Sequence, residues 1–186
     1  MRIAIIVGST RPGRKGLEVA QWVHAHASQR TTAEYELVDL VDYGLPLLDE
    51  PVPPAMQKEA TKEHTKRWGA KVASFDGYVF VTPEYNHGPP AALKNAMDFL
   101  YKEWCNKSAG FVGYGGVGAA RSVEMLRAIC SNLELADVRV ALSLMLATDF
   151  ENYSTFKPLA HQEKTLAQLL DQVEAWAGAL QPLRKT

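Results

Sequence analysis

The residues best suited to chemistry lie between positions 8 and 16, where an apolar run gives way to glycine, hydroxyl and cationic side chains. Residues 3–7 are all apolar, and the segment after them reads Gly8-Ser9-Thr10-Arg11-Pro12-Gly13-Arg14-Lys15-Gly16. When a buried strand ends in such a turn and a helix follows, free backbone N–H groups and the positive end of the helix dipole point at the turn. The hydroxyl and cationic side chains add further donors. This segment therefore predicts a binding site for a phosphate group.

Two later segments are suited to bringing backbone groups close to a ligand. In Pro83-Glu84-Tyr85-Asn86-His87-Gly88-Pro89-Pro90 the prolines restrict the backbone, and the glycine permits a positive φ. Such a rigid loop can present N–H and C=O groups to a planar heterocycle, with Tyr85 adding an aromatic edge or face. The segment Gly113-Tyr114-Gly115-Gly116-Val117-Gly118 matches G-x-G-x-x-G, a weak pattern when taken alone. Each segment is also compatible with a tightly packed turn, and whether His87 touches a ligand stays open.

Other chemistries find little support in the residue spacing. Gly8 and Gly13 have the spacing of a P-loop, but Arg14-Lys15 stands where that motif requires Lys followed by Ser or Thr. The sequence contains no G-x-S-x-G nucleophile motif. Cys105 and Cys130 lack the spacing of a phosphatase loop or a metal site, and the histidines show no ligand spacing. We therefore expect no metal, and two cysteines that serve packing.

Composition indicates a globular α/β protein. The chain has 186 residues, of which 47% are hydrophobic and 22% charged, and this suits one domain with a full core. Its formal net charge of −1 and its lack of a Lys/Arg block argue against binding to nucleic acid or to anionic membranes. No apolar run is long enough to span a membrane, and the N-terminus lacks the pattern of a signal peptide. Because the cysteines are read as reduced thiols, we expect a cytoplasmic protein.

Strand and helix patterns alternate along the chain. Strands are predicted at residues 2–7, 35–40, 78–82, 108–114 and 137–144, and helices at 15–28, 55–74, 91–100, 118–133 and 159–180. This order implies a parallel sheet with right-handed crossovers, either flavodoxin-like with strand order 2-1-3-4-5 or half of a Rossmann fold. In both folds ligands bind beyond the C-terminal ends of the strands, so the three glycine-containing loops described above are predicted to share one edge of the sheet.

The segments Gly8-Ser9-Thr10-Arg11, Pro83-Glu84-Tyr85-Asn86-His87-Gly88 and Leu93-Lys94-Asn95-Ala96 together resemble the NAD(P)H-dependent FMN reductases. This family includes quinone, azo-dye and chromate reductases. The resemblance runs from the first predicted strand through the fifth. It implies a flavodoxin-like three-layer sandwich with strand order 2-1-3-4-5, and a single FMN-binding domain over residues 1–186.

The resemblance also implies which residues hold the cofactor FMN. The 5′-phosphate is expected at Ser9, Arg11, Arg14 and the N–H groups through Gly16. The isoalloxazine ring is expected against Pro83, Glu84, Tyr85, Asn86 and His87, with backbone groups of Tyr114, Gly115 and Gly116 at its pyrimidine edge. Many relatives carry Ser or Asn around positions 14 and 16 as further phosphate ligands, whereas this chain has Arg14-Lys15-Gly16. Whether Arg14 and Lys15 serve the phosphate of FMN or that of NADPH stays open.

The activity that the resemblance implies is FMN-dependent oxidation of NADPH or NADH. Hydride passes to N5 of FMN and then on to a quinone, a free flavin, an azo compound or a similar small-molecule acceptor, with ping-pong kinetics and no catalytic acid or base from the protein. Members of the family are homodimers or homotetramers. The alternative is a flavodoxin-like electron carrier or flavin-binding regulatory protein without direct NAD(P)H turnover. The near-neutral charge and the cationic first loop argue against this alternative.

Overall fold

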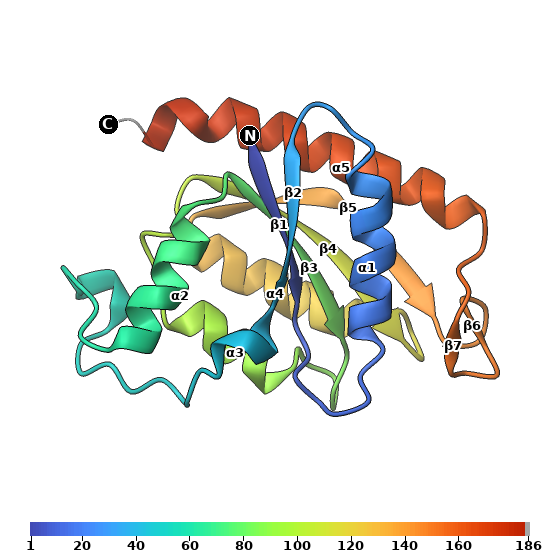
Figure 1. Ribbon diagram of the computed structural model, residues 1–186, viewed down its shortest axis with the longest axis horizontal. Helices are drawn as coiled ribbons and strands as arrows, with labels where there is room; N and C mark the ends of the chain where they lie inside the picture. The colour runs from blue at the N-terminus through green and yellow to red at the C-terminus, as the bar shows by residue number, and fades with distance from the viewer. Residues whose placement is uncertain (185–186) are drawn as a thin grey trace.

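Five parallel strands form the central sheet in the order β2-β1-β3-β4-β5 (Figure 1). The computed structural model describes residues 1–184. The strands are β1 (Arg2–Val7), β2 (Glu34–Asp39), β3 (Gly77–Pro83), β4 (Lys107–Gly115) and β5 (Leu135–Met145). The helices are α1 (Gly16–Ala27), α2 (Glu63–Ala73), α3 (Ala91–Asp98), α4 (Ala120–Asn132) and α5 (His161–Leu180). This order confirms the flavodoxin-like arrangement and excludes the half-Rossmann alternative.

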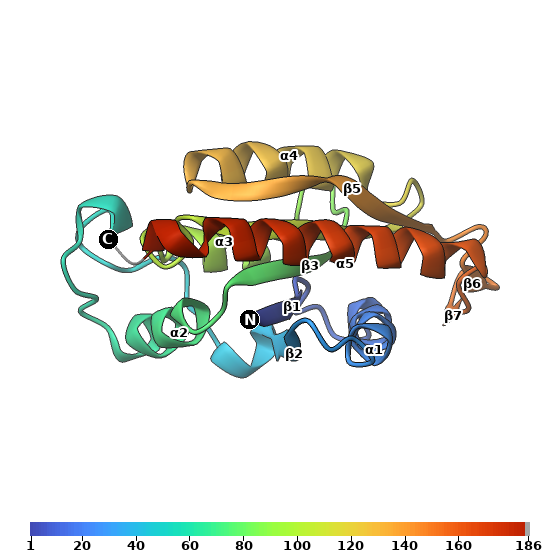
Figure 2. The same ribbon diagram turned by 90° about the horizontal axis from the view of Figure 1, so that it is seen from above.

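Helices cover both faces of the sheet because the strand side chains alternate between two apolar layers. In β1, Ile3, Ile5 and Val7 pack with residues of α1 and α5, whereas Ala4 and Ile6 pack with residues of α2, α3 and α4. Figure 2 shows α4 and α1 on opposite sides of the molecule, and the contacts of α5 place it in the same layer as α1. The result is the three-layer sandwich that the resemblance implied.

The helix predicted at 55–74 is shorter than expected. α2 begins at Glu63, and a short 3₁₀ turn, η2 (Pro54–Met56), precedes it. The intervening segment is held out of helical geometry by the Glu50 carboxylate, which accepts hydrogen bonds from the backbone N–H groups of Thr61 (3.1 Å) and Lys62 (3.0 Å). A helix periodicity cannot reveal a competing side-chain acceptor eleven or twelve residues away.

A small antiparallel hairpin after β5 was not predicted. It consists of β6 (Phe150–Glu151) and β7 (Thr155–Phe156), each of two residues, which is too short for any periodicity to show. In Figure 1 the hairpin lies at the same end of the molecule as the loops that follow β1 and β3. That end is the C-terminal edge of the sheet, where the backbone N–H of Gly8 is bonded to the carbonyl of Val81 (2.9 Å). The predicted convergence of these loops is therefore confirmed.

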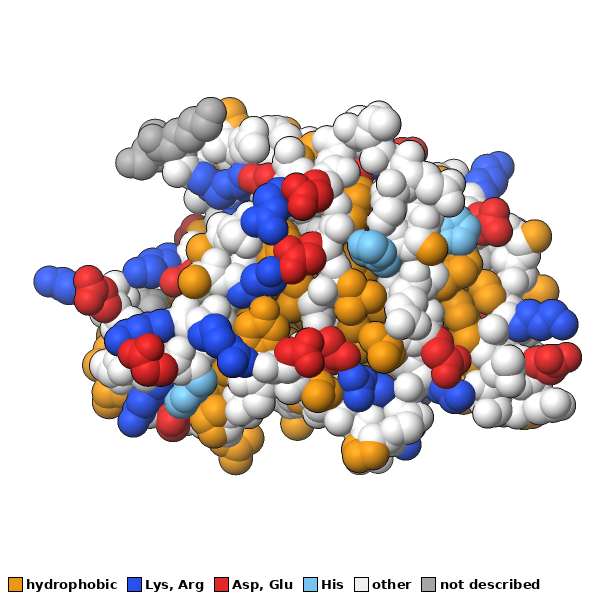
Figure 3. Space-filling model, viewed as in Figure 1, with side chains coloured by type: hydrophobic (Ala, Val, Ile, Leu, Met, Phe, Trp, Pro, Cys, Tyr) orange, Lys and Arg blue, Asp and Glu red, His pale blue; other side chains and the backbone are white. Residues whose placement is uncertain are grey.

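Charged side chains are interspersed on the surface. On the face shown in Figure 3, Lys and Arg side chains lie beside Asp and Glu side chains rather than gathering in a basic patch. Among the helices of residues 1–184, none has the length and apolar character needed to cross a membrane.

Candidate functional site

A cavity of about 330 Å³ opens at the C-terminal edge of the sheet. Its walls come from the loops after β1, β3, β4 and β5. The lining residues are Arg11, Gly13, Lys15, Pro83, Glu84, Tyr85, Tyr114, Gly115, Gly116, Leu146 and Tyr153. Pro83 and Tyr114 are neighbours in the β3–β4 register, which is what brings the second and third predicted segments together. The cavity thus joins all three segments that the sequence singled out.

Ser9 organises the turn at the end of β1. It is fully buried, and its Oγ lies 2.8 Å from the hydroxyl of Tyr85 and accepts the backbone N–H of Arg11 (3.3 Å). The Nε–H of Arg11 donates to the same Tyr85 hydroxyl (3.3 Å). The first loop and the Pro83–Gly88 loop are therefore joined by hydrogen bonds before any ligand enters. One of the two hydroxyl protons is used in this contact, which leaves the other available to an acceptor in the cavity.

Arg14 is fixed by an ion pair with Asp39 at the end of β2, at 2.5 Å, and both side chains are largely buried. Its Nε–H is sealed from solvent and has no hydrogen-bond partner within residues 1–184. Lys15, which is more exposed, pairs with Glu18 one turn along α1 (3.3 Å). Arg14 is therefore a pre-positioned buried cation with one spare donor, whereas Lys15 is a weakly held surface cation.

The Pro83–Gly88 loop closes in a two-residue turn. Tyr85 and Gly88 exchange both backbone hydrogen bonds (2.9 and 3.0 Å), and the central residues Asn86 and His87 have φ values of 50° and 69°. Two successive left-handed residues are typical of a type I′ turn, for which Asn is favoured. The turn carries Asn86 and His87 out to the surface, and the cavity lining includes neither. Tyr85 marks the edge of the cavity and is 36% exposed.

The carboxylate of Glu84 is bound by Arg121 of the same chain. One carboxylate oxygen accepts the backbone N–H of Arg121 (3.0 Å) at the start of α4, and the other accepts the Arg121 Nε–H (2.6 Å). Burial pushes the pKa of Glu84 upward, but the hydrogen bonds and charge of Arg121 outweigh it and hold that pKa below its ordinary value. The side chain therefore anchors the loop to α4 as a carboxylate.

The glycine-rich segment is a tight turn, and part of it lines the cavity. A Cβ on Gly113 would lie 2.3 Å from the carbonyl oxygen of Gly118, so this glycine is needed to close the turn. The carbonyl of Gly115 accepts hydrogen bonds from Gly118 (3.2 Å) and from Leu146 (3.0 Å). Gly115 and Gly116 also line the cavity. The outer backbone of this turn therefore faces the cavity.

Leu146 and Tyr153 belong to the cavity and were missed in the sequence. Leu146 follows β5, so the rule that placed the other three loops at this edge would have found it. Tyr153 arrives through the β6–β7 turn, where Asn152 and Tyr153 have φ values of 52° and 56°. The buried carboxylate of Asp149 organises this segment, accepting the N–H groups of Met145 (2.9 Å) and Leu159 (3.1 Å).

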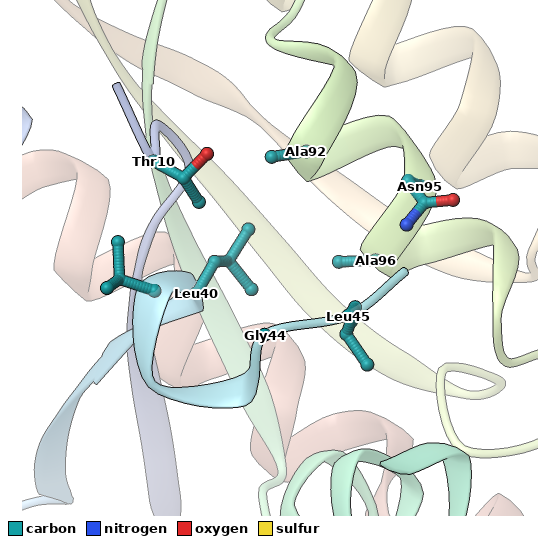
Figure 4. Close-up of a pocket in the computed structure, with 8 residues that line it drawn as sticks. Thr10, Leu40, Gly44, Leu45, Ala92, Asn95 and Ala96 are labelled. Atoms are coloured by element: carbon teal, nitrogen blue, oxygen red, sulfur yellow. The ribbon is translucent and has the colours of Figure 1, made fainter. Parts of the chain in front are cut away.

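A second cavity, of about 250 Å³, lies on the other side of the first loop (Figure 4). It is lined by Thr10, Leu40, Val41, Gly44, Leu45, Ala92, Asn95 and Ala96. Thr10 therefore faces away from the first cavity, although its hydroxyl was counted with the donors of the first loop. Asn95 donates to the carbonyl of Pro46 (2.7 Å) and accepts the N–H of Leu48 (2.9 Å), which fixes the proline-rich loop to α3.

The described part of the chain shows no cluster of metal ligands, and its buried thiol is not reactive. No group of three or more His, Cys, Asp or Glu side chains among residues 1–184 has the geometry to hold a metal. Burial raises the pKa of Cys130 to about 12, so its thiol is protonated and inert at neutral pH. The C-terminal edge of the sheet instead carries a cationic helix N-terminus, rigid loops and tyrosine side chains at the edge of the cavity. Together these features suit an anionic ligand with a planar ring.

Comparison with known proteins agrees with this geometry. The family model for NADPH-dependent FMN reductases matches residues 1–149. The chain is 40% identical over 169 residues to the NAD(P)H-dependent FMN reductase C4B3.06c of Schizosaccharomyces pombe, covering 90% of this chain and 84% of that protein. It is 30% identical over 143 residues to a 2-hydroxy-1,4-benzoquinone reductase of Burkholderia sp, covering 73% of each. The solved structure of the flavoenzyme FerB, an NAD(P)H:(acceptor) oxidoreductase from Paracoccus denitrificans, has the same fold with a TM-score of 0.68 at 22% identity, covering 97% of both chains.

Proposed function

The chain belongs to the family of NADPH-dependent FMN reductases, and from its site we propose that it passes electrons from NAD(P)H through FMN to quinones. The observation that carries the FMN site is the pair of buried donors without acceptors at the first loop. Arg14 Nε and Tyr114 Oη are both sealed from solvent and unpaired in the described part of the chain. Buried donors are normally satisfied, and a phosphate supplies only acceptors, so the residues present fit FMN.

In this proposal the protein contributes binding, orientation and electrostatics rather than an acid or base. Bound FMN supplies hydride and electron transfer. Ser9, Arg11, Arg14 and the N-terminus of α1 through Gly16 hold the phosphate. Pro83, Glu84 and Tyr85 form one wall of the ring site, whereas Asn86 and His87 lie at the tip of the turn, outside the cavity lining. Gly115 and Gly116 present backbone groups to the ring's polar edge, with Tyr114 beside them.

Quinones are the acceptor class that the rim of the cavity favours. Tyr85 and Tyr153 stand at its edge, and both are substantially exposed, 36% and 72%. A planar conjugated ring such as that of a quinone can stack on these side chains, and the hydroquinone formed from it is aromatic. The relative from Burkholderia sp is named as a benzoquinone reductase. An open site that admits NAD(P)H and acceptor in turn gives ping-pong kinetics.

The proposal extends to assembly and location. We propose a homodimer or homotetramer of a single FMN-binding domain in the cytoplasm. Apolar side chains exposed on the segment between β2 and α2 support association of this kind. These are Val41, Leu47, Leu48, Val52 and Met56.

Anaerobic absorbance spectroscopy tests the main proposal. The protein is reconstituted with FMN and its visible spectrum is recorded before and after addition of NADPH, then again after a benzoquinone. We expect the flavin bands to bleach within seconds and to return with the quinone, and initial rates to give parallel double-reciprocal lines. Bands that survive NADPH would instead identify an electron carrier. Intersecting lines would exclude the ping-pong order, and failure to retain FMN would reject the site.

A further inference from the structure

The side chain of Tyr114 runs from the end of β4 to the N-terminus of α1. Only 6% of the residue is exposed, and it belongs to the apolar layer between the sheet and α1 and α5. Its hydroxyl reaches the first residue of α1, because a Cβ built on Gly16 would lie 2.6 Å from Tyr114 Oη. The phenol oxygen therefore takes the space where a side chain at position 16 would begin.

This hydroxyl has a proton but no acceptor. Its oxygen is sealed from solvent, and no group in residues 1–184 accepts its proton in a hydrogen bond. Burial raises the pKa of Tyr114, as does the nearby Tyr85 hydroxyl, whereas Arg11, Arg14 and the backbone N–H of Gly16 act against that rise. The charged and N–H groups that face it are donors, and donors cannot accept the hydroxyl proton. An unpaired buried hydroxyl costs free energy, so its presence calls for a ligand acceptor.

We propose that the Tyr114 hydroxyl donates a hydrogen bond to the 5′-phosphate of FMN, taking the place of a side-chain donor at position 16. The inference rests on the proposed function and moves Tyr114 from the ring's polar edge to the phosphate end of the cavity. This hydroxyl lies beside the positive end of α1, and the spare Nε–H of Arg14 belongs to the turn that leads into the same helix. A phosphate group has several acceptor oxygens and no donor, so it can accept from donors of this kind together.

The test is Tyr114→Phe, read by titrating FMN and riboflavin into apo-protein and following flavin fluorescence. Riboflavin carries the same ring and ribityl chain but no phosphate. We expect the dissociation constant for FMN to rise by about tenfold or more, as for loss of a hydrogen bond to a charged group, and that for riboflavin to stay unchanged. The apo-protein should unfold at an unchanged or higher temperature, because the variant removes an unpaired polar group.

The matched control is Tyr35→Phe. Tyr35 is a phenol of similar burial, 8% exposed, in the same apolar layer, but its hydroxyl donates to Glu174 (2.6 Å) at the other end of the sheet. This variant should lower the unfolding temperature and leave the FMN dissociation constant unchanged. The two substitutions remove the same atom, so opposite results separate a ligand-binding hydroxyl from a structural one.

A second variant tests the geometry. In the wild-type background Gly16→Ala should weaken FMN binding, because the new Cβ displaces the Tyr114 hydroxyl. When Tyr114→Phe is also present, Gly16→Ala should weaken binding little further, because the nearest ring atom lies 3.3 Å from the new Cβ. Equal losses for FMN and riboflavin, an unchanged FMN affinity, or a destabilised apo-protein in Tyr114→Phe would each overturn the inference. Failure of the wild-type protein to bind FMN would instead reject the proposed function.

Discussion

At the scale of single residues, the site depends on donors that are held in place before a ligand arrives. Ser9 is the clearest case, since its hydroxyl joins Arg11 and Tyr85. We expect Ser9→Ala to raise the FMN dissociation constant about tenfold, because the Arg11 N–H loses its acceptor and the Tyr85 hydroxyl loses one of its two partners. Thr10→Ala, in the same loop but facing the second cavity, should leave that constant unchanged in the same fluorescence titration. If both variants lost FMN affinity equally, the prediction would be wrong, because the effect would not depend on which cavity the hydroxyl faces.

At the scale of elements, the β6–β7 hairpin brings an aromatic side chain to the cavity at the cost of backbone strain. Tyr153 has a positive φ, which is costly for a bulky residue. Tyr153→Gly should raise the free energy of unfolding by about 0.5–1 kcal/mol, because glycine adopts a positive φ without strain. The same variant should increase the KM for a benzoquinone about fivefold, because the substrate loses contact with one aromatic ring. Asn152→Gly changes the other strained residue of the turn, outside the cavity lining, and should leave the KM alone. Steady-state kinetics and urea unfolding of both variants decide whether the hairpin contributes to acceptor binding.

The attachment of α5 is a second element with a measurable signature. Glu174 on this helix accepts hydrogen bonds from Arg30 (2.7 Å), Thr32 (2.6 Å) and Tyr35 (2.6 Å), which joins α5 to β2 and the end of α1. Burial alone would raise the pKa of Glu174, but these donors lower it from 4.5 to about 2. Between these values the folded protein binds fewer protons than the unfolded chain, so the contribution is complete above about pH 5 and is lost as the pH falls toward 2.

Glu174→Gln should therefore lower the free energy of unfolding by about 3 kcal/mol at pH 7, because the variant removes the carboxylate charge that Arg30 and the two hydroxyls stabilise. The difference from wild type should shrink steadily in urea titrations between pH 5 and pH 3. A difference that does not change over this range would show that the carboxylate's charge is not what stabilises the contact.

At the scale of the whole molecule, the exposed apolar segment between β2 and α2 is the feature that favours self-association. Leu47 and Met56 are 82% and 78% exposed, and Asn95 holds the loop that carries Leu47 in a fixed conformation. We expect Leu47→Glu to convert the oligomer to monomers in light scattering after size exclusion, because a carboxylate cannot be buried unpaired in an interface. Leu159→Glu, an exposed position next to α5, serves as the control. An oligomer that survives Leu47→Glu would place the interface elsewhere.

The fold class and the edge of the sheet that carries the cavity can be predicted from local sequence patterns alone. The alternation of strand and helix patterns implies a parallel sheet, and parallel strands place the loops after residues 7, 83 and 115 on one edge whatever the details of packing. The sequence also predicts the cationic turn at Arg11 and Arg14 and the rigid loop at Pro83, because the residue types within each segment limit its backbone conformation.

Other features depend on contacts between segments that are far apart in the chain, and only the folded molecule shows them. The choice of strand order came from which strands pair, and α2 is short because Glu50 binds two backbone N–H groups that a helix would otherwise use. Tyr153 enters the cavity only through the fold of a hairpin far along the chain. Tyr114 is the sharpest case, since its side chain meets Gly16 from almost a hundred positions away. Whether a buried hydroxyl has an acceptor is a property of the packed molecule, because burial and partners are both set by chain segments that the local sequence does not contain.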